Sequence, residues 1–374
     1  MGLGVRSESE RQGCDFFFEH ARGIFHDADV VIGNLEGLLH EPMGVESQPL
    51  PFCGSPSFAE AMKRAGITLV TVANNHTLEH GSCIFEETVS LLEKSGVSVC
   101  GLRCQEGIYH SKPVILEIKA KKIGFLAYNW VGVDKFPESD RHIAQSRNSL
   151  VNYTWNRDVQ LVATPGQANA NLISDVRLLK QEVDYVVLLP HWGYEFVHYP
   201  PLGVIQEAKS FIEAGADMII GSHPHVLQGM EYFSGKPVFY SLGNFIFDFR
   251  PRSLRYTAIL STEISDDWSV NYYFSPFIIG KNFQPRPAKG RDARCIQEIL
   301  GKYIDIRDNH GESLNDDCVY REYEKRYNRL KLQNIIYHFT LLPSHPSLGK
   351  VIMRKFFSAV CLAKSRLQGN KIRW

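Results

Sequence analysis

Asp217-Met218-Ile219-Ile220-Gly221-Ser222-His223-Pro224-His225 is the stretch that decides the fold. It begins with a short predicted strand, Asp217–Ile220, which passes through Gly221 directly into two histidines. Three earlier predicted strands also end in side chains that bind metals or phosphate: Asn34 and Glu36 after Val30–Ile32, Asn74, Asn75 and His76 after Thr68–Ala73, and His191 after Asp184–Leu189. Ligands of α/β sheets bind beyond the carboxyl ends of the strands. The four clusters therefore predict one shared site.

Strand and helix patterns alternate from Asp29 to about Phe277. The predicted helices are Ser57–Ala65, Phe85–Ser95, Leu172–Glu182 and Ile205–Ala214, and the further strands are Val97–Cys100, Val114–Ile118, Ile123–Tyr128 and Val238–Leu242. This alternation predicts an α/β fold with a mixed or parallel sheet and helices outside it. The later runs Tyr256–Ile264 and Val270–Ile279 predict a hairpin that extends a second sheet. About 134–170 carries no recognisable pattern.

The composition of the 374 residues supports a sizeable core, because 44% are hydrophobic. Its 41 basic and 41 acidic residues cancel, which gives no reason to expect nucleic acid as a partner. The eight cysteines are scattered without a CxxC pair, so we expect reduced thiols packed as small apolar residues. The sequence shows neither a membrane-spanning apolar run nor a signal peptide, and we expect a cytoplasmic protein.

Beyond Gly290 the pattern changes to long charged helices, and the last 34 residues carry seven Lys or Arg and no acid. We therefore expect a main domain over residues 1–285 and a helical, basic extension over residues 286–374. Within the extension, Val351–Leu367 is amphipathic. It is interpreted either as a helix docked on the domain or as a surface helix attracted to an anionic membrane or polymer.

The residue types at the strand ends suit a divalent metal site. Imidazole, carboxylate and amide oxygen together favour borderline ions such as Mn²⁺, Fe²⁺ or Zn²⁺. Two such ions about 3.5–4 Å apart can clamp a phosphoryl group and lower the pKa of a shared water. Glu36 could lie between the ions, and His223 and His225 could each bind one, with Pro224 stiffening their loop.

Each residue also has a structural interpretation. His191 alone could be a hydrogen-bonded core residue, Asn74-Asn75-His76 a turn, and Glu36 a helix cap. His76 could act as general acid toward a leaving group. Trp192 could line the cavity or only pack in the core, and Gly243-Asn244-Phe245 could approach the site or form a tight turn. The joint occurrence of the clusters at strand ends favours the metal site.

These residues lie in five segments through which the chain resembles the CapA family, the capsule or poly-γ-glutamate synthesis proteins, within the calcineurin-like metallophosphoesterases. The matching segments, in order, are Ala28–Glu36, Ala73–His76, His191–Glu195, Gly221–His225 and Tyr240–Phe245. The similarity spans about residues 3–280. The resemblance implies a calcineurin-like metallophosphatase sandwich of two β-sheets flanked by helices, with two divalent ions at the strand ends.

The resemblance also implies roles by position. Glu36 resembles the bridging acid, Asn75 and His191 ligands of one ion, His223 and His225 the remaining ligands, and His76 the catalytic histidine facing the substrate. Further residues expected around the site, beside the ligands or the substrate, are Asn34, Asn74, Glu79, Trp192, Glu195 and Asn244.

Two departures from the family pattern stand out. The family typically opens with a strand that ends in Gly-Asp, whose Asp binds metal, whereas this sequence starts just after that point, so we expect the first strand to be missing. Glu79 stands where the family commonly has Asp.

Two functions follow as hypotheses. The first is a metal-dependent phosphoesterase-type hydrolase in capsule, exopolysaccharide or poly-γ-glutamate biosynthesis, acting on a polymer precursor or another phosphoester. The second is a non-catalytic accessory protein of polymer synthesis with a degenerate metal site. Capsule synthase proteins are expected partners in either case.

Overall fold

The structure is a computed structural model that describes residues 2–41, 52–105, 108–131, 168–309, 325, 326 and 329. The amphipathic stretch Val351–Leu367 and almost all of the unassigned stretch 134–170 lie outside the described residues. The described cysteines with a placed side chain are free thiols; Cys14, Cys53 and Cys100 are buried as expected, whereas Cys83 is exposed and Cys295 is partly buried.

The first sheet has four strands in the order β1-β4-β5-β6, of which β1, β4 and β5 are parallel and β6 is antiparallel. Its strands are β1 (Ile32–Asn34), β4 (Leu69–Thr71), β5 (Ser98–Gln105) and β6 (Ile108–Lys112). Five helical segments precede or connect them: α1 (Leu3–Gln12), η1 (Cys14–Phe18), α2 (Arg22–His26), α3 (Ser57–Ala65) and α4 (Ser82–Lys94). Gly66 ends α3 in the left-handed region, at φ 101°, which a residue with a side chain adopts only with strain.

The second sheet has six strands in the order β11-β12-β10-β9-β8-β7, with a parallel centre and antiparallel edges. Its strands are β7 (Val114–Ile118), β8 (Lys121–Asn129), β9 (Tyr185–His191), β10 (Met218–Ile220), β11 (Met230–Phe233) and β12 (Lys236–Phe239). The helices α6 (Ala168–Glu182) and α7 (Leu202–Ala214) cover its outer face, where Val176 and Phe211 pack on Leu188 and Ile219. β9 is buried along its whole length, which agrees with the apolar run of its sequence before His191.

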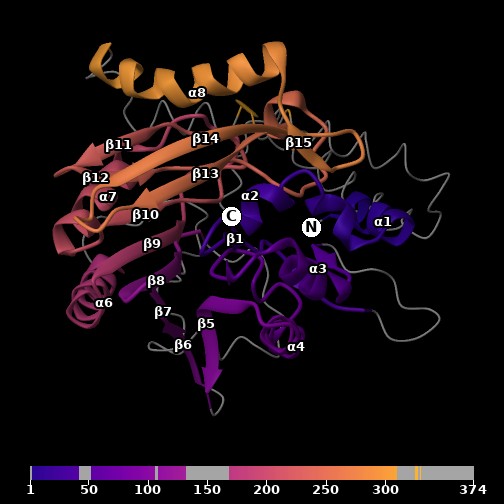
Figure 1. Ribbon diagram of the computed structural model, residues 1–374, viewed down its shortest axis with the longest axis horizontal. Helices are drawn as coiled ribbons and strands as arrows, with labels where there is room; N and C mark the ends of the chain where they lie inside the picture. The colour runs from indigo at the N-terminus through magenta and orange to yellow at the C-terminus, as the bar shows by residue number, and fades with distance from the viewer. Residues whose placement is uncertain are drawn as a thin grey trace, which may run out of the picture.

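The predicted hairpin does not extend the second sheet: in the described residues it forms a separate third, antiparallel sheet, β13-β14-β15, although its two long strands have the predicted bounds. The strands are β13 (Tyr256–Ile264), β14 (Val270–Ile279) and β15 (Pro285–Pro287). The short elements β2 (Leu38–Leu39), β3 (Cys53–Gly54) and η3 (Arg252–Arg255) complete the described loops. The long helix α8 (Gly290–Asn309) lies over β14 at the top of Figure 1, and Ile296 and Leu300 pack there against Leu227 and Ala258. The expected boundary at residues 285/286 thus falls at the start of β15.

Two apolar layers enclose the first sheet. One face packs on α1 to α4 through a core that includes Phe17 and Phe58, and the other face meets the second sheet through a core that includes Leu69 and Leu189. Helices, sheet, sheet and helices therefore follow one another, which confirms the predicted α/β sandwich. The carboxyl ends of β1, β4, β9 and β10 bring the four predicted polar clusters together.

Candidate metal site

One group of ligand atoms joins the ends of β4, β9 and β10. His191 Nε2 lies 3.0 Å from Asn75 Oδ1 and 3.2 Å from His223 Nδ1. The other ring nitrogen of His191 lies 2.9 Å from Ser222 Oγ. If His191 donates its proton to Ser222 and His223 carries its proton on Nε2, three lone-pair atoms of Asn75, His191 and His223 face one another. Such a convergence of acceptors is unfavourable unless a cation lies among them.

A second group lies around Glu36, just beyond β1. His225 Nε2 is 3.1 Å from Glu36 Oε1 and 3.8 Å from Glu195 Oε1. One possible ligand atom from each of Glu195, His223 and His225 lies within 4.8 Å of the others. Glu195 was expected only beside the ligands, but its carboxylate lies among the possible ligand atoms themselves.

Two asparagines hold these groups in place. Asn244 Oδ1 lies 2.8 Å from His225 Nδ1, so the imidazole can donate there and turn its Nε2 toward Glu36. The Asn244 amide also donates to the His225 carbonyl, which closes the contact from both sides. Asn74 donates to the Leu35 carbonyl at 2.8 Å and to Asn34 Oδ1 at 3.3 Å, which fixes the β4 loop to the β1 loop. Asn34 in turn donates to Glu36 Oε2 at 3.2 Å.

His76 lies at the rim of the Glu36 group. Its Nδ1 is 2.7 Å from Glu79 Oε2, and its Nε2 is 3.9 Å from Glu36 Oε1. The ring stacks on Phe52, with the ring centroids 4.0 Å apart. Glu79 thus reaches His76 in spite of its extra methylene, and it orients the ring with Nε2 toward Glu36.

The backbone at the site is strained. His223 and His225 have φ values of 99° and 56°, and Phe196, whose ring stacks on His225, has a φ of 66°. Residues other than glycine rarely adopt this left-handed region of the backbone, and those that do cluster at functional sites. The fold therefore holds both histidines in conformations that local preference disfavours.

Burial and neighbouring charges shift the pKa values of the ionisable site residues in different directions. Burial lowers the pKa of His191 to about 3 and also holds the pKa of His223 well below its ordinary value, so both rings are neutral and can act as ligands. Burial also opposes a charge on His225, but the Glu36 carboxylate outweighs it and raises the pKa of His225 to about 9. Burial would raise the pKa of Glu36, yet His225 and His191 hold it well below its ordinary range.

The donor set fits a borderline divalent ion. Imidazole nitrogens, an amide oxygen and carboxylate oxygens are combined in a site whose asparagine and histidine side chains are buried, whereas the Glu195 side chain is 21% exposed. His191 Nε2 and Asn75 Oδ1, which lie 3.0 Å apart, would be two of its ligand atoms.

Trp192 and Gly243, for which the sequence left a place in the site open, do not reach it. Trp192 is fully buried in the apolar core beside Tyr240 and donates from Nε1 to the Tyr240 carbonyl at 3.1 Å, as its packing interpretation described. Gly243 forms a tight turn at φ 73°, and only the next residue, Asn244, reaches the site. No sequence pattern indicated the aromatic wall of the site, which includes Phe52, Phe196 and Phe247.

The fold and the site define an α/β protein with several sheets flanked by helices and with a candidate divalent-metal site at its strand ends. The chain belongs to the family described as bacterial capsule synthesis protein PGA_cap, whose sequence profile matches residues 1–249. This confirms the resemblance to the capsule and poly-γ-glutamate synthesis proteins.

Two relatives show how far the similarity reaches. The chain is 26% identical over 297 residues to the PGA biosynthesis protein CapA of Bacillus subtilis, covering 77% of this chain and 71% of that protein. It is 27% identical over 256 residues to the capsule biosynthesis protein CapA of Bacillus anthracis, covering 66% of this chain and 57% of that protein. The chain thus spans little more than half the length of the second relative.

Among solved structures, a hypothetical protein from Thermus thermophilus aligns with a TM-score of 0.40 and 15% identity, over 71% of this chain and 94% of that one. In the described part of this chain, no helix is both long and apolar enough to cross a membrane.

Proposed function

We propose that the protein is a divalent-metal-dependent hydrolase of the phosphoesterase type that acts in the synthesis of capsule polymer or poly-γ-glutamate. The convergence of Asn75, His191 and His223 beside Glu36 and His225 carries this proposal. Membership of the capsule synthesis family supplies the biological setting. The substrate we propose is a phosphoester, such as an activated precursor of the polymer.

The residues divide into two sets of ligands. Asn75, His191 and His223 would hold one ion, while His225 and Glu195 would hold a second, with Glu36 between them. Bound ions of this kind supply Lewis acidity and lower the pKa of water toward neutrality. We propose Mn²⁺, Fe²⁺ or Zn²⁺, because the donor set mixes nitrogen and oxygen.

His76 is the candidate acid of the reaction. Glu79 accepts from its Nδ1, which turns Nε2 toward Glu36 and the Asn75 amide, and a proton carried on Nε2 could pass to the leaving oxygen of a phosphoester. Phe52 covers one face of the ring and keeps its orientation. The chain thereby positions a proton donor beside the proposed ions.

The proposed partners are the synthase proteins that consume the polymer precursor. A second proposed contact is an anionic membrane surface bound by the basic C-terminal residues, which co-sedimentation with vesicles, with and without residues 350–374, would test.

Metal content and hydrolysis together test the proposed function. Protein purified with Mn²⁺ should retain about two ions per chain and hydrolyse p-nitrophenyl phosphate or its bis-ester. His191→Ala should lower this activity about a hundredfold or more, whereas His26→Ala, on the exposed side of α2, should not. A chain that binds no metal and shows no metal-stimulated hydrolysis would instead be a non-catalytic accessory protein.

A further inference from the structure

Basic side chains gather beside the candidate metal site, on the third sheet and on the loop that leads into it. The loop 249–255 carries three arginines, the segment 280–287 carries a lysine and an arginine, and neither contains an acidic residue. Four of the five basic residues are exposed, and only Arg255 is half-buried. We call the five residues the basic patch: Arg250, Arg252, Arg255, Lys281 and Arg286.

Hydrogen bonds between the two segments hold the patch together. Arg250 donates from Nη1 to the Lys281 carbonyl at 3.2 Å, and its guanidinium lies over the Phe283 ring, 4.7 Å from the ring centroid. Arg255 donates from Nε to the Ile279 carbonyl at 2.7 Å, at the end of β14. The loop that carries the arginines is therefore fixed against the turn that carries the lysine.

Arg286 lies on the same face of the third sheet as Tyr256, where the loop enters β13. Both residues pair with Ile278 of β14, which lies between them, and residues paired directly across antiparallel strands point to the same face. The Tyr256 hydroxyl accepts from Arg252 Nε at 3.1 Å. Two strand spacings, about 10 Å, separate Arg286 from the residue that holds Arg252, so the patch continues from the loop onto β15.

Like charges act on one another within the patch. The acids nearest to it in the sequence are Asp248 and Asp292, so five basic residues stand against two acids. Arg252 forms an ion pair with Asp292. The pKa of Arg255 is nevertheless lowered, first by burial and then by the charges of Arg252 and Arg286. Because such neighbours repel one another, an anion bound among them would be stabilised.

Both ends of the arginine-bearing loop contact residues of the metal site. The Phe249 ring packs edge-on against the His225 ring, with centroids 5.3 Å apart. At the other end, the Leu254 carbonyl accepts from the Asn244 amide at 3.1 Å, and Asn244 also holds the His225 ring. The arginines are therefore carried by a loop that is built into the metal site.

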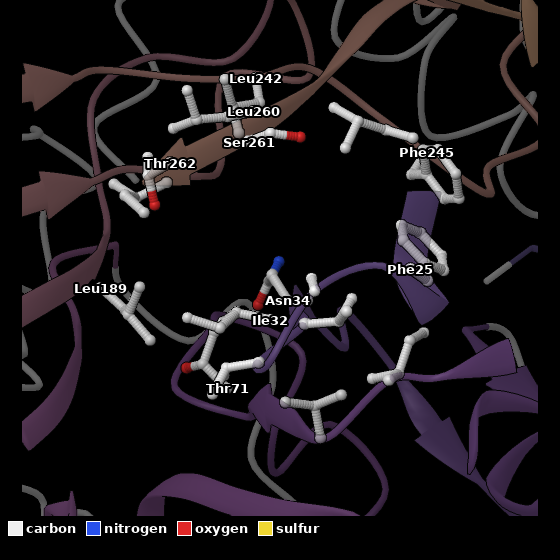
Figure 2. A pocket seen from close by; sticks show the side chains of 18 of the residues that line it. Phe25, Ile32, Asn34, Thr71, Leu189, Leu242, Phe245, Leu260, Ser261 and Thr262 are labelled. Carbon is white, nitrogen blue, oxygen red and sulfur yellow. The ribbon is translucent and has the colours of Figure 1, made fainter. Parts of the chain in front are cut away.

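The cavity beside the site does not suit an anionic ligand. It has a volume of about 930 Å³, and Glu36 and His225 are among the residues that line it. Figure 2 shows that most side chains around it are apolar, among them Ile32, Leu189 and Leu260. Apolar walls cannot replace the hydration of an anion. A negatively charged ligand is better bound at the basic patch.

The composition of the patch favours a ligand with repeated carboxylates. Four of its five residues are arginines, whose planar guanidinium can donate two parallel hydrogen bonds to one carboxylate. A single small anion would bind one or two of them, whereas positive charges spread over a loop and a strand suit a chain that carries a charge on each unit. A membrane surface, by contrast, attracts lysine and arginine alike.

We propose that the basic patch binds an anionic polymer with one carboxylate per unit and holds it beside the metal site. The patch thereby gives the class of polymer on which the protein acts, and to that extent the inference rests on the proposed function. The binding itself requires neither a metal ion nor hydrolysis. A failed hydrolase assay therefore leaves the binding test intact, and a failed binding test leaves the proposed hydrolase intact.

Binding of a fluorescent poly-γ-glutamate oligomer to the full chain tests the proposal, measured by anisotropy in EDTA so that no metal ion takes part. Lys281→Gln combined with Arg286→Gln removes two exposed charges of the patch and should weaken binding at least about tenfold. Lys94→Gln combined with Lys209→Gln removes two exposed charges from α4 and α7, which lie away from β15 in Figure 1, and should leave the affinity unchanged. An oligomer whose carboxylates are methyl esters should not bind.

Protection of the arginines from phenylglyoxal, followed by mass spectrometry on the unsubstituted chain, provides a second measurement. With the oligomer at about ten times its Kd, Arg250 and Arg286 should react about tenfold more slowly, whereas Arg177, exposed on α6, should react as before. Unprotected arginines, or an unchanged affinity in the double variant of the patch, would overturn the proposal. Equal patch-dependent binding of single-stranded DNA or of phosphatidylglycerol vesicles would overturn the choice of a carboxylate polymer.

Discussion

His225 Nε2 lies 3.1 Å from Glu36 Oε1, although 188 residues separate the two in the chain. Glu36 follows β1 of the first sheet, and His225 follows β10 of the second, so this contact joins the two sheets at the candidate site. Both side chains are almost completely buried. Because a buried charge needs a partner, the carboxylate and the imidazole determine each other's protonation.

The first prediction concerns that coupling. Glu36→Gln keeps the shape of the side chain but removes its charge, so only burial and weaker contacts act on His225. The pKa of His225 should then fall from about 9 to below 7, because burial alone disfavours the charged ring. NMR titration of the metal-free protein measures it. Glu87→Gln, beside His40 on the surface, should leave the His225 titration unchanged, and a His225 pKa that stays near 9 in Glu36→Gln would contradict the expected coupling.

The second prediction concerns the loop that carries both histidines. A methyl group on Gly221 would overlap Trp192 Nε1 and the Tyr240 carbonyl, which are hydrogen-bonded to each other. Gly221→Ala should therefore cost about 1–3 kcal/mol of unfolding free energy and weaken Mn²⁺ binding, because the loop must move. Urea unfolding and calorimetric titration measure the two effects.

Gly203→Ala is the matched control for that substitution. Gly203 lies in α7, and a Cβ atom there meets nothing within 4 Å. Alanine is also the better helix former, so this variant should gain about 0.5–1 kcal/mol and bind Mn²⁺ as before. Equal effects of the two variants would show that close packing at Gly221 does not position the site.

Much of the fold could be predicted because apolar periodicity is local. α3, β7, β13 and β14 have the predicted bounds, and β9 was evident from its apolar run. α1 was missed because LGVRSESERQ has almost no apolar face, and its place is set by contacts such as that of Gly4 with Asp248. β12 ends at Phe239, earlier than predicted, because the next residues turn toward β11 and the site.

The candidate site, like the fold, could be predicted from the sequence only in part. The sequence indicated the ligands since each follows a strand, and parallel strands bring their ends to one edge. The contribution of Glu195 and the stacking of Phe52 on His76 depend on loop conformations with positive φ at Phe196 and Phe52, which no local pattern encodes. The ligands that follow strands were therefore predicted with their roles, whereas Glu195 was predicted only as a neighbour of the site and Phe52 not at all.

The third prediction tests the core beneath the helices. Phe58 of α3 is fully buried and packs its ring against Phe17 and Phe18 of η1, with centroids 5.6 and 6.5 Å apart. Phe58→Ala should cost about 3–5 kcal/mol in urea unfolding, because it removes apolar contact and leaves a cavity. Tyr273→Ala, at a residue that is 54% exposed on β14, should change stability by no more than about 0.5 kcal/mol. A small loss at Phe58 would mean that α3 is not anchored through this ring.

The fourth prediction concerns a buried acid outside the site. Glu207 of α7 is 5% exposed, and burial raises its pKa to about 8 while the neighbouring Trp130 partly offsets the rise. Between about pH 4.5 and pH 8 the unfolded chain loses this proton and the folded chain keeps it, so the contribution of Glu207 to the unfolding free energy falls as pH rises. It levels off above about pH 8. The limiting slope for one proton is about 1.4 kcal/mol per pH unit.

Glu207→Gln removes the titrating group but keeps a similar shape, and it isolates this contribution. Urea unfolding at pH 5, 6, 7 and 8 should show a less negative pH slope for Glu207→Gln than for the wild type, and the variant should gain most at pH 8. Glu213→Gln, on the exposed side of the same helix, should keep the wild-type slope. If the slope of Glu207→Gln matched that of the wild type, the acid would be ionised in the folded protein and water would have to reach it beneath α7.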